Sequence, residues 1–426
     1  MTHSRPFRVC FTGNLSQPIL EPLASMIHGA EGRVEINGIG QWTVDTGRIC
    51  ETIPLAPMPK EPLGFLKSRV KKSVKKTSTI QSPGSTRRSF KSRCLRLAMR
   101  VNDSIDRGLH SSRFRQMLSQ SDLIHLHGAF NSRAFRMLAH GQIPKPLVVS
   151  LWGSDIFRKS DLALVAVQQK LFRKADAITV SSPEFRETVL AKYGLELRDK
   201  IHLTQFSPTF EGIQKLDAAE GRQTFRKSHS INDNSMVLCV GHNGTRECQH
   251  LELLTSLSRL PETLKQRLHI VVPMTYAGTP SYQSEVRAAA EQTGIEYTQL
   301  TEFMSDEEVA SLRHASDLLI YAPVSDAFSA TVTQFLATNT ICILGSWLPY
   351  NTRRRAGLKY WEIDSPSDAG KVLESLLLDW QPTCDSVQEN QQISFDFFDS
   401  TKLGTQWIRA YEAAAKTDIL TVRDNE

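Results

Sequence analysis

The 426-residue sequence contains no apolar run that approaches the roughly 18 residues needed to cross a bilayer. Its seven cysteines include no CxxC pair, and Cys10, Cys239 and Cys342 lie in apolar runs typical of buried strands. We therefore expect free thiols in a reducing compartment and no metal site. The first 14 residues are too short and too polar for a secretory signal, which favours a cytoplasmic protein.

The segment 62–102 lacks acidic residues altogether but contains twelve lysines and arginines, while the whole chain carries a net charge of +6. The remainder of the chain is therefore net acidic. Apolar residues such as Phe65, Val70 and Phe90 are interleaved with these charges. That mixture favours an anionic membrane surface over nucleic acid as the partner, and peripheral attachment to the inner face of the cytoplasmic membrane. A solvated insert without a partner is the alternative.

Short apolar runs alternate with helix-like stretches along nearly the whole chain. Without strict polar alternation, such runs are typical of parallel strands that are covered on both faces. The predicted strands are Phe7–Phe11, Leu123–Leu126, Leu147–Leu151, Ala177–Val180, Ile201–Thr204, Met236–Val240, Leu268–Val272, Tyr297–Leu300, Leu318–Tyr321 and Ile341–Leu344. Two such series predict an α/β protein with two doubly wound Rossmann-like domains.

The domain boundaries follow from composition. We expect a first domain over 1–209 that includes the basic insert, and a polar linker over 210–234. A second domain would cover 235–393, and a helical tail 394–426 would pack on the body of the protein.

A glycine-rich loop, Gly241-His242-Asn243-Gly244-Thr245-Arg246, follows one predicted strand and precedes a leucine-rich helical pattern. Glycines allow close backbone approach, a helix start directs amides outward, and Arg246 adds positive charge, so the pattern is typical of a phosphate site. The loop lacks the Lys-Ser/Thr ending of a P-loop and the three-glycine spacing of a dinucleotide fingerprint. An ordinary strand-to-helix turn is the alternative.

Polar and glycine residues follow many of the predicted strands. In open α/β sheets ligands bind beyond the carboxyl ends of the strands. Two such edges facing each other predict a cleft between the domains as the substrate site. The residues concerned include His127-Gly128, Trp152-Gly153-Ser154-Asp155, Ser181-Ser182, the glycine loop, Pro273 to Tyr276 and Ala322 to Thr331.

This layout resembles the GT-B glycosyltransferases, related to family-4-like enzymes, in which two Rossmann-like domains close on a nucleotide-sugar and an acceptor. The passages that carry the likeness are Asp122-Leu-Ile-His-Leu-His127-Gly128 with Val148-Val-Ser-Leu-Trp-Gly-Ser-Asp155, Ala175-Asp-Ala-Ile-Thr-Val-Ser181, and Thr301-Glu-Phe-Met304 with Ala315-Ser-Asp-Leu-Leu-Ile-Tyr321. More narrowly, residues 236–345 resemble the 4-acetamido-4,6-dideoxygalactosyltransferases, which act on lipid-linked sugars in enterobacterial common antigen synthesis.

The resemblance implies a role for the glycine loop and its surroundings. Gly241, Gly244 and Arg246 would meet the donor pyrophosphate, where the cation offsets charge on the leaving group. Neighbouring donor-binding residues would be His242, Asn243, His250 and Tyr276. His250 could donate to phosphate or lie on a helix surface, and Tyr276 could stack on the base or pack at the rim.

The turn Ser325–Thr331 would open a helix toward the same pyrophosphate, and Asp326, Ser329 and Thr331 would bind the donor. Many retaining relatives place an acidic residue here and, seven residues later, a glutamate that grips the ribose diol. This chain has Asp326 and Gln334 instead. An amide oxygen serves two hydroxyls less well than a carboxylate, so a dTDP-sugar with its single ribose hydroxyl is one interpretation. A buried helix residue is the other.

On the acceptor side, Asp155 or His127 would take a proton from the acceptor hydroxyl. The alternatives are a helix N-cap for Asp155 and a supporting histidine for His127. Trp152, Gly13 and Asn14 would line the acceptor site.

The resemblance implies a glycosyltransferase of the hexosyltransferase class that needs neither metal nor cofactor, acting on a lipid-linked glycan or polysaccharide precursor of the cell envelope. Inversion and retention at the anomeric carbon both remain open. A non-catalytic protein with this fold that binds a nucleotide-sugar or polyanion is the alternative.

Overall fold

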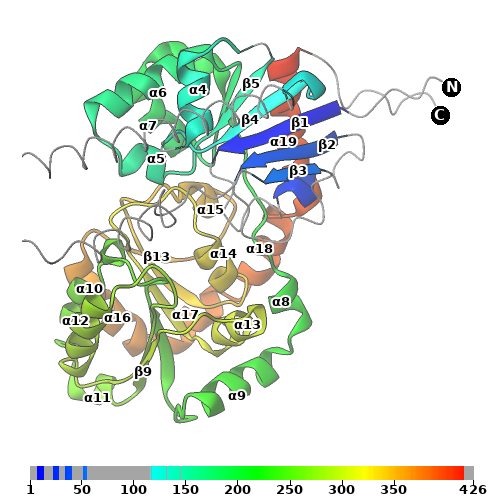
Figure 1. The fold of residues 1–426 in the computed structure, drawn as a ribbon. Helices are drawn as coiled ribbons and strands as arrows, with labels where there is room; N and C mark the ends of the chain where they lie inside the picture. Colours follow the sequence, from blue (N-terminus) through cyan, green and yellow to red (C-terminus); the bar gives the residue numbers. More distant parts are fainter. Residues whose placement is uncertain are drawn as a thin grey trace, which may run out of the picture.

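The computed structural model describes residues 7–13, 23–27, 34–40, 51–54, 116, 118–130, 132–143 and 145–416. Its two halves each contain one sheet, and every strand pair in both sheets is parallel. The sheets lie in two separate lobes (Figure 1). The predicted fold class, two doubly wound α/β domains, is confirmed.

The first sheet has the order β3-β2-β1-β4-β5-β6-β7. Its strands are β1 (Phe7–Gly13), β2 (Val34–Gly40), β3 (Glu51–Pro54), β4 (Leu123–His127), β5 (Leu147–Ser150), β6 (Ala177–Val180) and β7 (Ile201–Leu203). All five strands predicted in this half are present. We did not predict β2, which contains two glycines, or β3, which has four residues and ends on proline.

The second sheet has the order β10-β9-β8-β11-β12-β13. Its strands are β8 (Met236–Val240), β9 (Leu268–Pro273), β10 (Glu296–Leu300), β11 (Leu318–Tyr321), β12 (Ile341–Gly345) and β13 (Trp361–Ile363). The five predicted strands are again present, and β13, three residues at one edge, is the additional one. Leu238 and Val240 join one apolar cluster, whereas Val237 and Cys239 join others. The central strand is therefore buried on both faces.

Helices connect the strands and cover the sheets (Figure 1). The α-helices are α4 (Arg133–His140), α5 (Ser154–Phe157), α6 (Leu162–Lys174), α7 (Pro183–Tyr193), α8 (Glu211–Lys215), α9 (Ala218–Ser228), α10 (His250–Leu257), α11 (Glu262–Lys265), α12 (Pro280–Glu291), α13 (Asp306–Ala315), α14 (Ala330–Leu336), α15 (Asn351–Arg355), α16 (Ala369–Leu378), α17 (Trp380–Ser386), α18 (Asn390–Phe397) and α19 (Ser400–Ala415). Short 3₁₀ helices are η1 (Leu195–Lys200), η2 (Arg246–Cys248) and η3 (Pro366–Asp368).

The segment 210–234, predicted as a polar linker, contains the helices α8 and α9 instead. Phe225 and Ile231 are buried in an apolar cluster with Val237 of β8 and Leu312 of α13. Asp217 caps α9 by accepting from the backbone N–H of Glu220. The helix α9 packs against the second domain through a few apolar residues. Because the rest of the segment is polar, the sequence did not indicate this packing.

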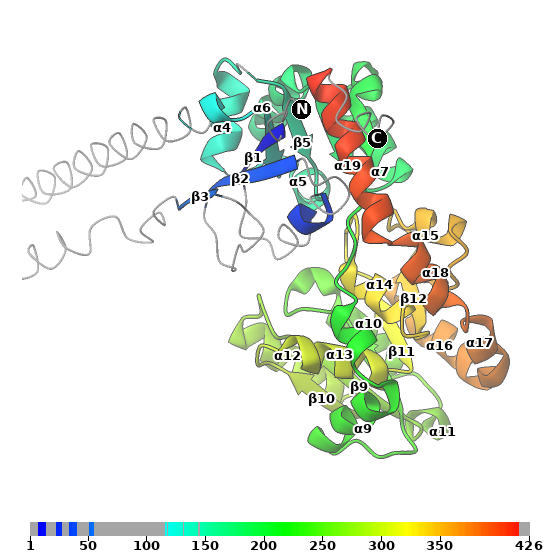
Figure 2. The same cartoon turned by 90° about the vertical axis from the view of Figure 1, so that its right-hand side faces the viewer.

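The C-terminal helices return to the first domain. Figure 2 shows α18 beside the second domain and α19 running up against the first. The indole Nε1 of Trp407 donates to the carbonyl of Gln205 at 2.6 Å, and the Tyr411 hydroxyl lies 2.8 Å from Nδ1 of His125. The predicted packing of this tail is therefore seen in detail, and α19 holds the first sheet in place relative to the second domain.

Cys10, Cys239 and Cys342 are buried and free, as predicted. Within the described part of the chain, no helix combines the length and apolarity that a membrane crossing requires. The basic segment 62–102 lies outside the described residues, so its predicted membrane contact stays a prediction.

Candidate functional site

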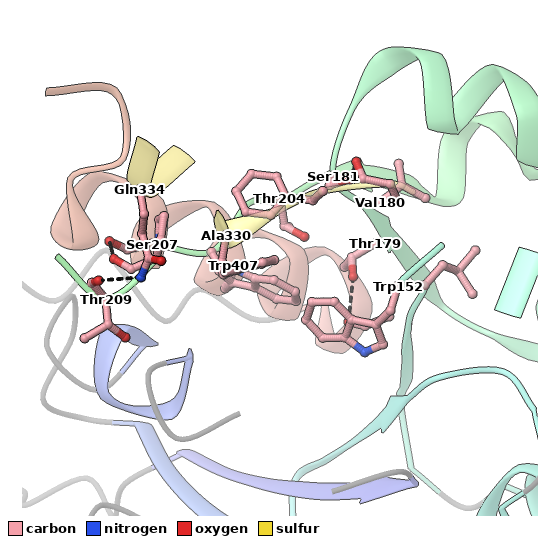
Figure 3. A pocket seen from close by; sticks show the side chains of 16 residues that line it. Trp152, Thr179, Val180, Ser181, Thr204, Ser207, Thr209, Ala330, Gln334 and Trp407 are labelled. Atoms are coloured by element: carbon pink, nitrogen blue, oxygen red, sulfur yellow. Dashed lines mark hydrogen bonds between the residues drawn. The ribbon is translucent and has the colours of Figure 1, made fainter. Parts of the chain in front are cut away.

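A pocket of about 370 Å³ lies between the two domains. Trp152, Thr179 and Ser181 line it from the first domain, and Phe328 and Gln334 from the second. The segment 204–210 that connects the domains contributes Phe206 and Thr209, and the helix α19 contributes Trp407. Figure 3 shows Thr209 and Trp407 in the wall of this pocket. Its described lining residues carry aromatic and aliphatic groups, hydroxyls and one amide, and none of them carries a carboxylate or an imidazole. Such a wall suits a ligand with an apolar face and several hydroxyls.

Two aromatic pairs shape this pocket. The rings of Trp152 and Trp407 are stacked with centroids 6.5 Å apart, and Phe206 meets Phe328 edge to face at 4.2 Å. Each pair brings together residues far apart in the sequence, and the Phe206–Phe328 pair joins the interdomain connection to the second domain. The pocket wall therefore depends on how the domains are placed.

The turn 325–331 docks directly on the first domain. Arg158 donates from Nε to Oγ of Ser325 at 3.0 Å and from Nη2 to the carbonyl of Ser325 at 2.7 Å. The Ser181 hydroxyl donates to the carbonyl of Ala327 at 3.1 Å. An ion pair between Arg355 and Glu184, 2.8 Å, adds a further contact between the domains. These contacts hold the cleft in a closed arrangement.

Gly153 of the first domain lies close against Ala327 of the second domain. Its φ is +97°, and a Cβ built there would lie 2.5 Å from Cβ of Ala327. We expect Gly153→Ala to force the turn 325–331 away from the first domain and to lower stability by about 1–3 kcal/mol through strain and clash. Small-angle scattering should show a larger radius of gyration. Adding Ala327→Gly should restore part of the compactness, and an unchanged radius in the single variant would contradict this contact.

The glycine loop has the predicted position, between β8 and the helical turn η2 that leads to α10. Its shape is set by internal contacts. The side-chain oxygen Oδ1 of Asn243 accepts from the backbone N–H of Thr245 at 2.9 Å. The backbone N–H of Gly244 donates to the backbone carbonyl of Tyr276 at 2.9 Å. A Cβ on Gly244 would lie 2.5 Å from the Cα of Gly278, so this glycine permits close packing of two loops.

The contact that we expected between Arg246 and the donor diphosphate stays a prediction, and the structure shows another partner for this side chain. Its guanidinium pairs with Glu285 of α12 at 2.6 Å, lies 4.5 Å from the ring centroid of Tyr282, and its side chain is 61% exposed. The turn from Gly244 through η2 directs the side chain toward the start of α12. In this position a carboxylate already neutralises the cation that we assigned to the diphosphate.

Arg246→Ala should therefore change stability by less than about 1 kcal/mol, because exposed ion pairs contribute little. Turnover of a nucleotide-sugar should stay within roughly threefold of the unmodified protein, which is what about 0.6 kcal/mol corresponds to. The matched variant Glu285→Ala should behave alike. A 10- to 100-fold loss confined to Arg246→Ala would restore the original assignment.

His250 is part of the core and does not reach a phosphate. Its side chain is fully buried, Nδ1 lies 3.2 Å from the Tyr282 hydroxyl, and Nε2 faces Gly241, where a Cβ would come within 2.5 Å. Gly241, with φ +76°, leaves the space that this imidazole fills. Tyr276, in contrast, is 50% exposed at the end of β9, where a planar ligand group can stack on it.

His242 and Asp326 lie at the carboxyl edge of the second sheet. Nε2 of His242 is 2.8 Å from the Asn243 amide nitrogen, and its ring centroid is 5.0 Å from that of Tyr321. The Asp326 carboxylate accepts from the hydroxyls of Tyr321 and Tyr350. Both donors come from the buried tyrosines behind the turn, so the carboxylate is held by the protein itself.

The remaining donor-side residues are also engaged. Ser329 is the N-cap of α14, and its hydroxyl accepts from the N–H of Val332. Gln334 donates to the carbonyl of Thr209 at 3.1 Å and accepts from Nε of Arg313 at 3.3 Å, which ties α14 to the interdomain connection. Thr331 is half-buried in the first turn of α14.

Asp155 is fully buried and organises the backbone of the first domain. Its carboxylate accepts from the N–H groups of Ala129, Trp152 and Gly153 at 3.0–3.1 Å. Burial, partly offset by these hydrogen bonds, raises the pKa of Asp155 to about 6. With both oxygens occupied, this side chain ties together the loops after β4 and β5 and is not presented to an acceptor.

His127 is also fully buried, with its ring 4.4 Å from Phe11 and stacked on Trp152 at 5.9 Å. Neither ring nitrogen has a hydrogen-bond partner among the residues that the structure describes. Burial lowers the pKa of His127 to about 3, so the ring is neutral at pH 7. Trp152 itself is half-buried and reaches the pocket, whereas Gly13 ends β1 and Asn14 lies outside the described residues.

The sequence interpretation missed the arginines that meet the turn and the pocket. Arg158 docks on the turn, Arg353 donates from Nη2 to the carbonyl of Ser329 and to Thr333, and Arg313 contacts Gln334. Their sequence signal is weak, because Arg158 follows the short helix α5 while Arg313 and Arg353 lie within α13 and α15, and none of the three follows a strand. Among the described residues, no group of three or more His, Cys, Asp and Glu side chains is placed to hold a metal ion.

Comparison with known proteins agrees with this architecture. Residues 85–204 match the family model described as glycosyl transferase 4-like domain. No curated protein sequence matches the chain. Among solved structures, a glycosyltransferase from Rickettsia africae has a TM-score of 0.67 at 12% identity, with 98% of this chain and 100% of that chain covered.

Two further structures are similar. HepE of Anabaena, in complex with UDP and glucose, has a TM-score of 0.65 at 13% identity, covering 96% of this chain and 100% of that one. WaaG, a glycosyltransferase involved in lipopolysaccharide biosynthesis, has a TM-score of 0.58 at 13% identity, covering 96% and 99%. The chain has the GT-B fold. The GT-B cleft in this molecule is the space between the carboxyl edges of its two sheets, where the pocket lies.

Proposed function

We propose that this protein is a glycosyltransferase that moves a sugar from a nucleotide diphosphate-sugar to a hydroxyl of a lipid-linked glycan or polysaccharide precursor. The observation that supports this most is the pocket between two parallel sheets, with hydroxyls and stacked rings on its wall. The domain match over 85–204 and the GT-B fold point to the same activity. The similar HepE structure contains UDP and glucose.

The pocket also bears on the chemistry. Among the residues that the structure describes, the lining includes no carboxylate or imidazole, and both bases that we considered, Asp155 and His127, are fully buried. We infer that the acceptor proton passes to the departing diphosphate oxygen, while the acceptor oxygen forms the new bond to the anomeric carbon. The proton acceptor then lies on the same face of the sugar as the leaving group. This arrangement favours retention of configuration at the anomeric carbon over inversion.

We also propose a narrower class of donor and a location for the acceptor. Gln334 in place of a carboxylate supports a deoxyribose nucleotide such as a dTDP-deoxyamino sugar, which fits the resemblance of residues 236–345 to the 4-acetamido-4,6-dideoxygalactosyltransferases. The basic segment 62–102 supports an acceptor at an anionic membrane surface. Flotation with neutral and anionic liposomes, beside an oligonucleotide-binding control, tests that location.

A thermal-shift panel with UDP-, GDP- and dTDP-sugars tests the proposed function. A donor at 100 times its Kd should stabilise the protein by about 2.7 kcal/mol. Product analysis by NMR then reports the configuration of the new bond. If no nucleotide-sugar stabilises the protein and none is hydrolysed or transferred, the glycosyltransferase proposal fails.

The same burial of both candidate bases favours one alternative, a non-catalytic protein that binds nucleotide-sugars in this cleft. Such a protein would show stabilisation by a donor without turnover in the presence of any glycan acceptor tested.

A further inference from the structure

Arg313 is a buried arginine without an acidic partner. It lies in α13, and the residue is 7% exposed. Its Nε donates to Oε1 of Gln334 at 3.3 Å, and its guanidinium lies 4.3 Å from the ring centroid of Phe335. Among the described residues, no carboxylate comes within ion-pair distance of it, and its Nη atoms are neither hydrogen-bonded nor sealed from solvent.

Its guanidinium acts on residues at the carboxyl edge of the second sheet. Burial lowers the pKa of His242 to about 4, and the charge of Arg313 acts in the same direction. Burial raises the pKa of Tyr276, and the charge of Arg313 opposes that rise. His242 follows β8, Tyr276 follows β9, and Gln334 lies in α14. Arg313 is therefore placed among the three elements that face the cleft.

Arg226 shows how this protein satisfies a buried arginine elsewhere. It is 4% exposed, pairs with Asp317 at 3.5 Å and donates to the carbonyls of Asn232 and Ser235 at 2.8 Å each. Arg313 is buried to a similar degree with a single neutral acceptor. Burying a charge without an ionic partner is costly, so such a cation indicates a ligand anion.

We propose that Arg313 binds an oxyanion of the substrate, a phosphate or a carboxylate, beside Gln334 and thereby determines substrate specificity. The choice of substrate class rests on the proposed function. Gln334 is essential to this arrangement, because a glutamate at this position would form an ion pair with Arg313 and neutralise its charge. The neutral amide leaves the guanidinium free for the ligand.

Titration calorimetry and thermal shift with inorganic pyrophosphate and with glucuronate test the proposal, with uridine as a neutral control. Either anion should stabilise the unmodified protein, and the one that does identifies the source of the oxyanion. Arg313→Met and Gln334→Glu should each weaken that binding roughly 10- to 100-fold, as loss of a charge-assisted contact predicts. Without ligand, both variants should melt at the same temperature as the unmodified protein or higher.

The matched control is Arg222→Met, which removes an equal charge from the surface pair with Asp317 and should leave anion binding unchanged. If Arg313→Met does not fold, Gln334→Glu carries the test. Anion binding that both variants retain, or no binding of either anion by the unmodified protein, overturns the proposal. Anion binding through Arg313 without turnover of any donor would instead contradict the glycosyltransferase function and leave this site standing.

Discussion

Asp155→Ala should lower the free energy of unfolding by about 3–5 kcal/mol, because it leaves three buried N–H groups without an acceptor. The loss should exceed that of any exposed acidic residue in the first domain. Asp161→Ala is the matched control, since Asp161 caps α6 at the surface and accepts a single N–H from Leu164. Removing that cap should cost only about 1 kcal/mol. Urea unfolding of the three proteins measures both values.

The same variants separate a structural role for Asp155 from a catalytic one. A general base would show a fall in kcat for Asp155→Asn with an unchanged melting temperature. The buried position instead predicts a lower melting temperature and nearly full activity per folded molecule. A stable Asp155→Asn protein with kcat reduced 100-fold would contradict this interpretation.

Acidification from pH 7 to pH 4 should destabilise the protein strongly. Three histidines, His125, His127 and His250, are fully buried, and His242 is half-buried after β8. Burial lowers the pKa of His127 to about 3, that of His242 and of His250 to about 4, and that of His125 well below its usual range. The unfolded chain therefore binds more protons below pH 6.5 than the folded one. The stability contributed by the neutral rings is complete above about pH 6.5 and is lost as the pH falls toward 3–4.

The size of this effect follows from the pKa shifts. A shift from 6.5 to about 4 corresponds to on the order of 3 kcal/mol for each of His242 and His250. Asp155 acts in the opposite direction, because its carboxyl group takes up its proton at a higher pH in the folded protein than in the unfolded chain. Because burial raises its folded pKa to about 6, its contribution is complete below about pH 4 and is lost as the pH rises through 6.

Urea midpoints measured at pH 7.5, 6.5, 5.5 and 4.5 test the acid effect. His127→Phe is the informative variant, because this ring has no hydrogen-bond partner and packs between Phe11 and Trp152. This variant should reduce the slope of the free energy of unfolding against pH, because the unfolded chain then binds about one proton fewer relative to the folded protein. A flat profile between pH 7 and 5 would show that these histidines are not sealed from solvent.

The fold could be predicted from sequence because its strands carry a local signal. Apolar runs such as Met236–Val240 and Leu318–Tyr321 are central and buried on both faces, so each is apolar along its whole length. The missed strands β2, β3 and β13 lie at or beside sheet edges, where glycine, proline and polar residues interrupt the pattern. The helix α9 was missed for a related reason, because only one face of it is buried.

The candidate site was only partly predictable. Sequence placed Trp152, Tyr276 and Gln334 near the cleft, since each lies in or after the carboxyl edge of a sheet. It could not tell which polar side chains turn inward. Asp155 and His250 are buried in the protein, and Arg246 pairs with Glu285 at the surface of α12.

For this protein, local sequence alone determined two wound parallel sheets, their order along the chain and the edges at which polar residues collect. Which way each charged side chain points, and which group it contacts, was decided only by the tertiary structure. A guanidinium or carboxylate is satisfied by whichever partner folding brings within about 3 Å. Asp155 accepts from Ala129, 26 residues away in the chain, and Arg158 donates to Ser325, 167 residues away. Arg158 meets Ser325 because the two domains pack on each other, whereas Arg313 meets Gln334 because α13 and α14 come together within the second domain.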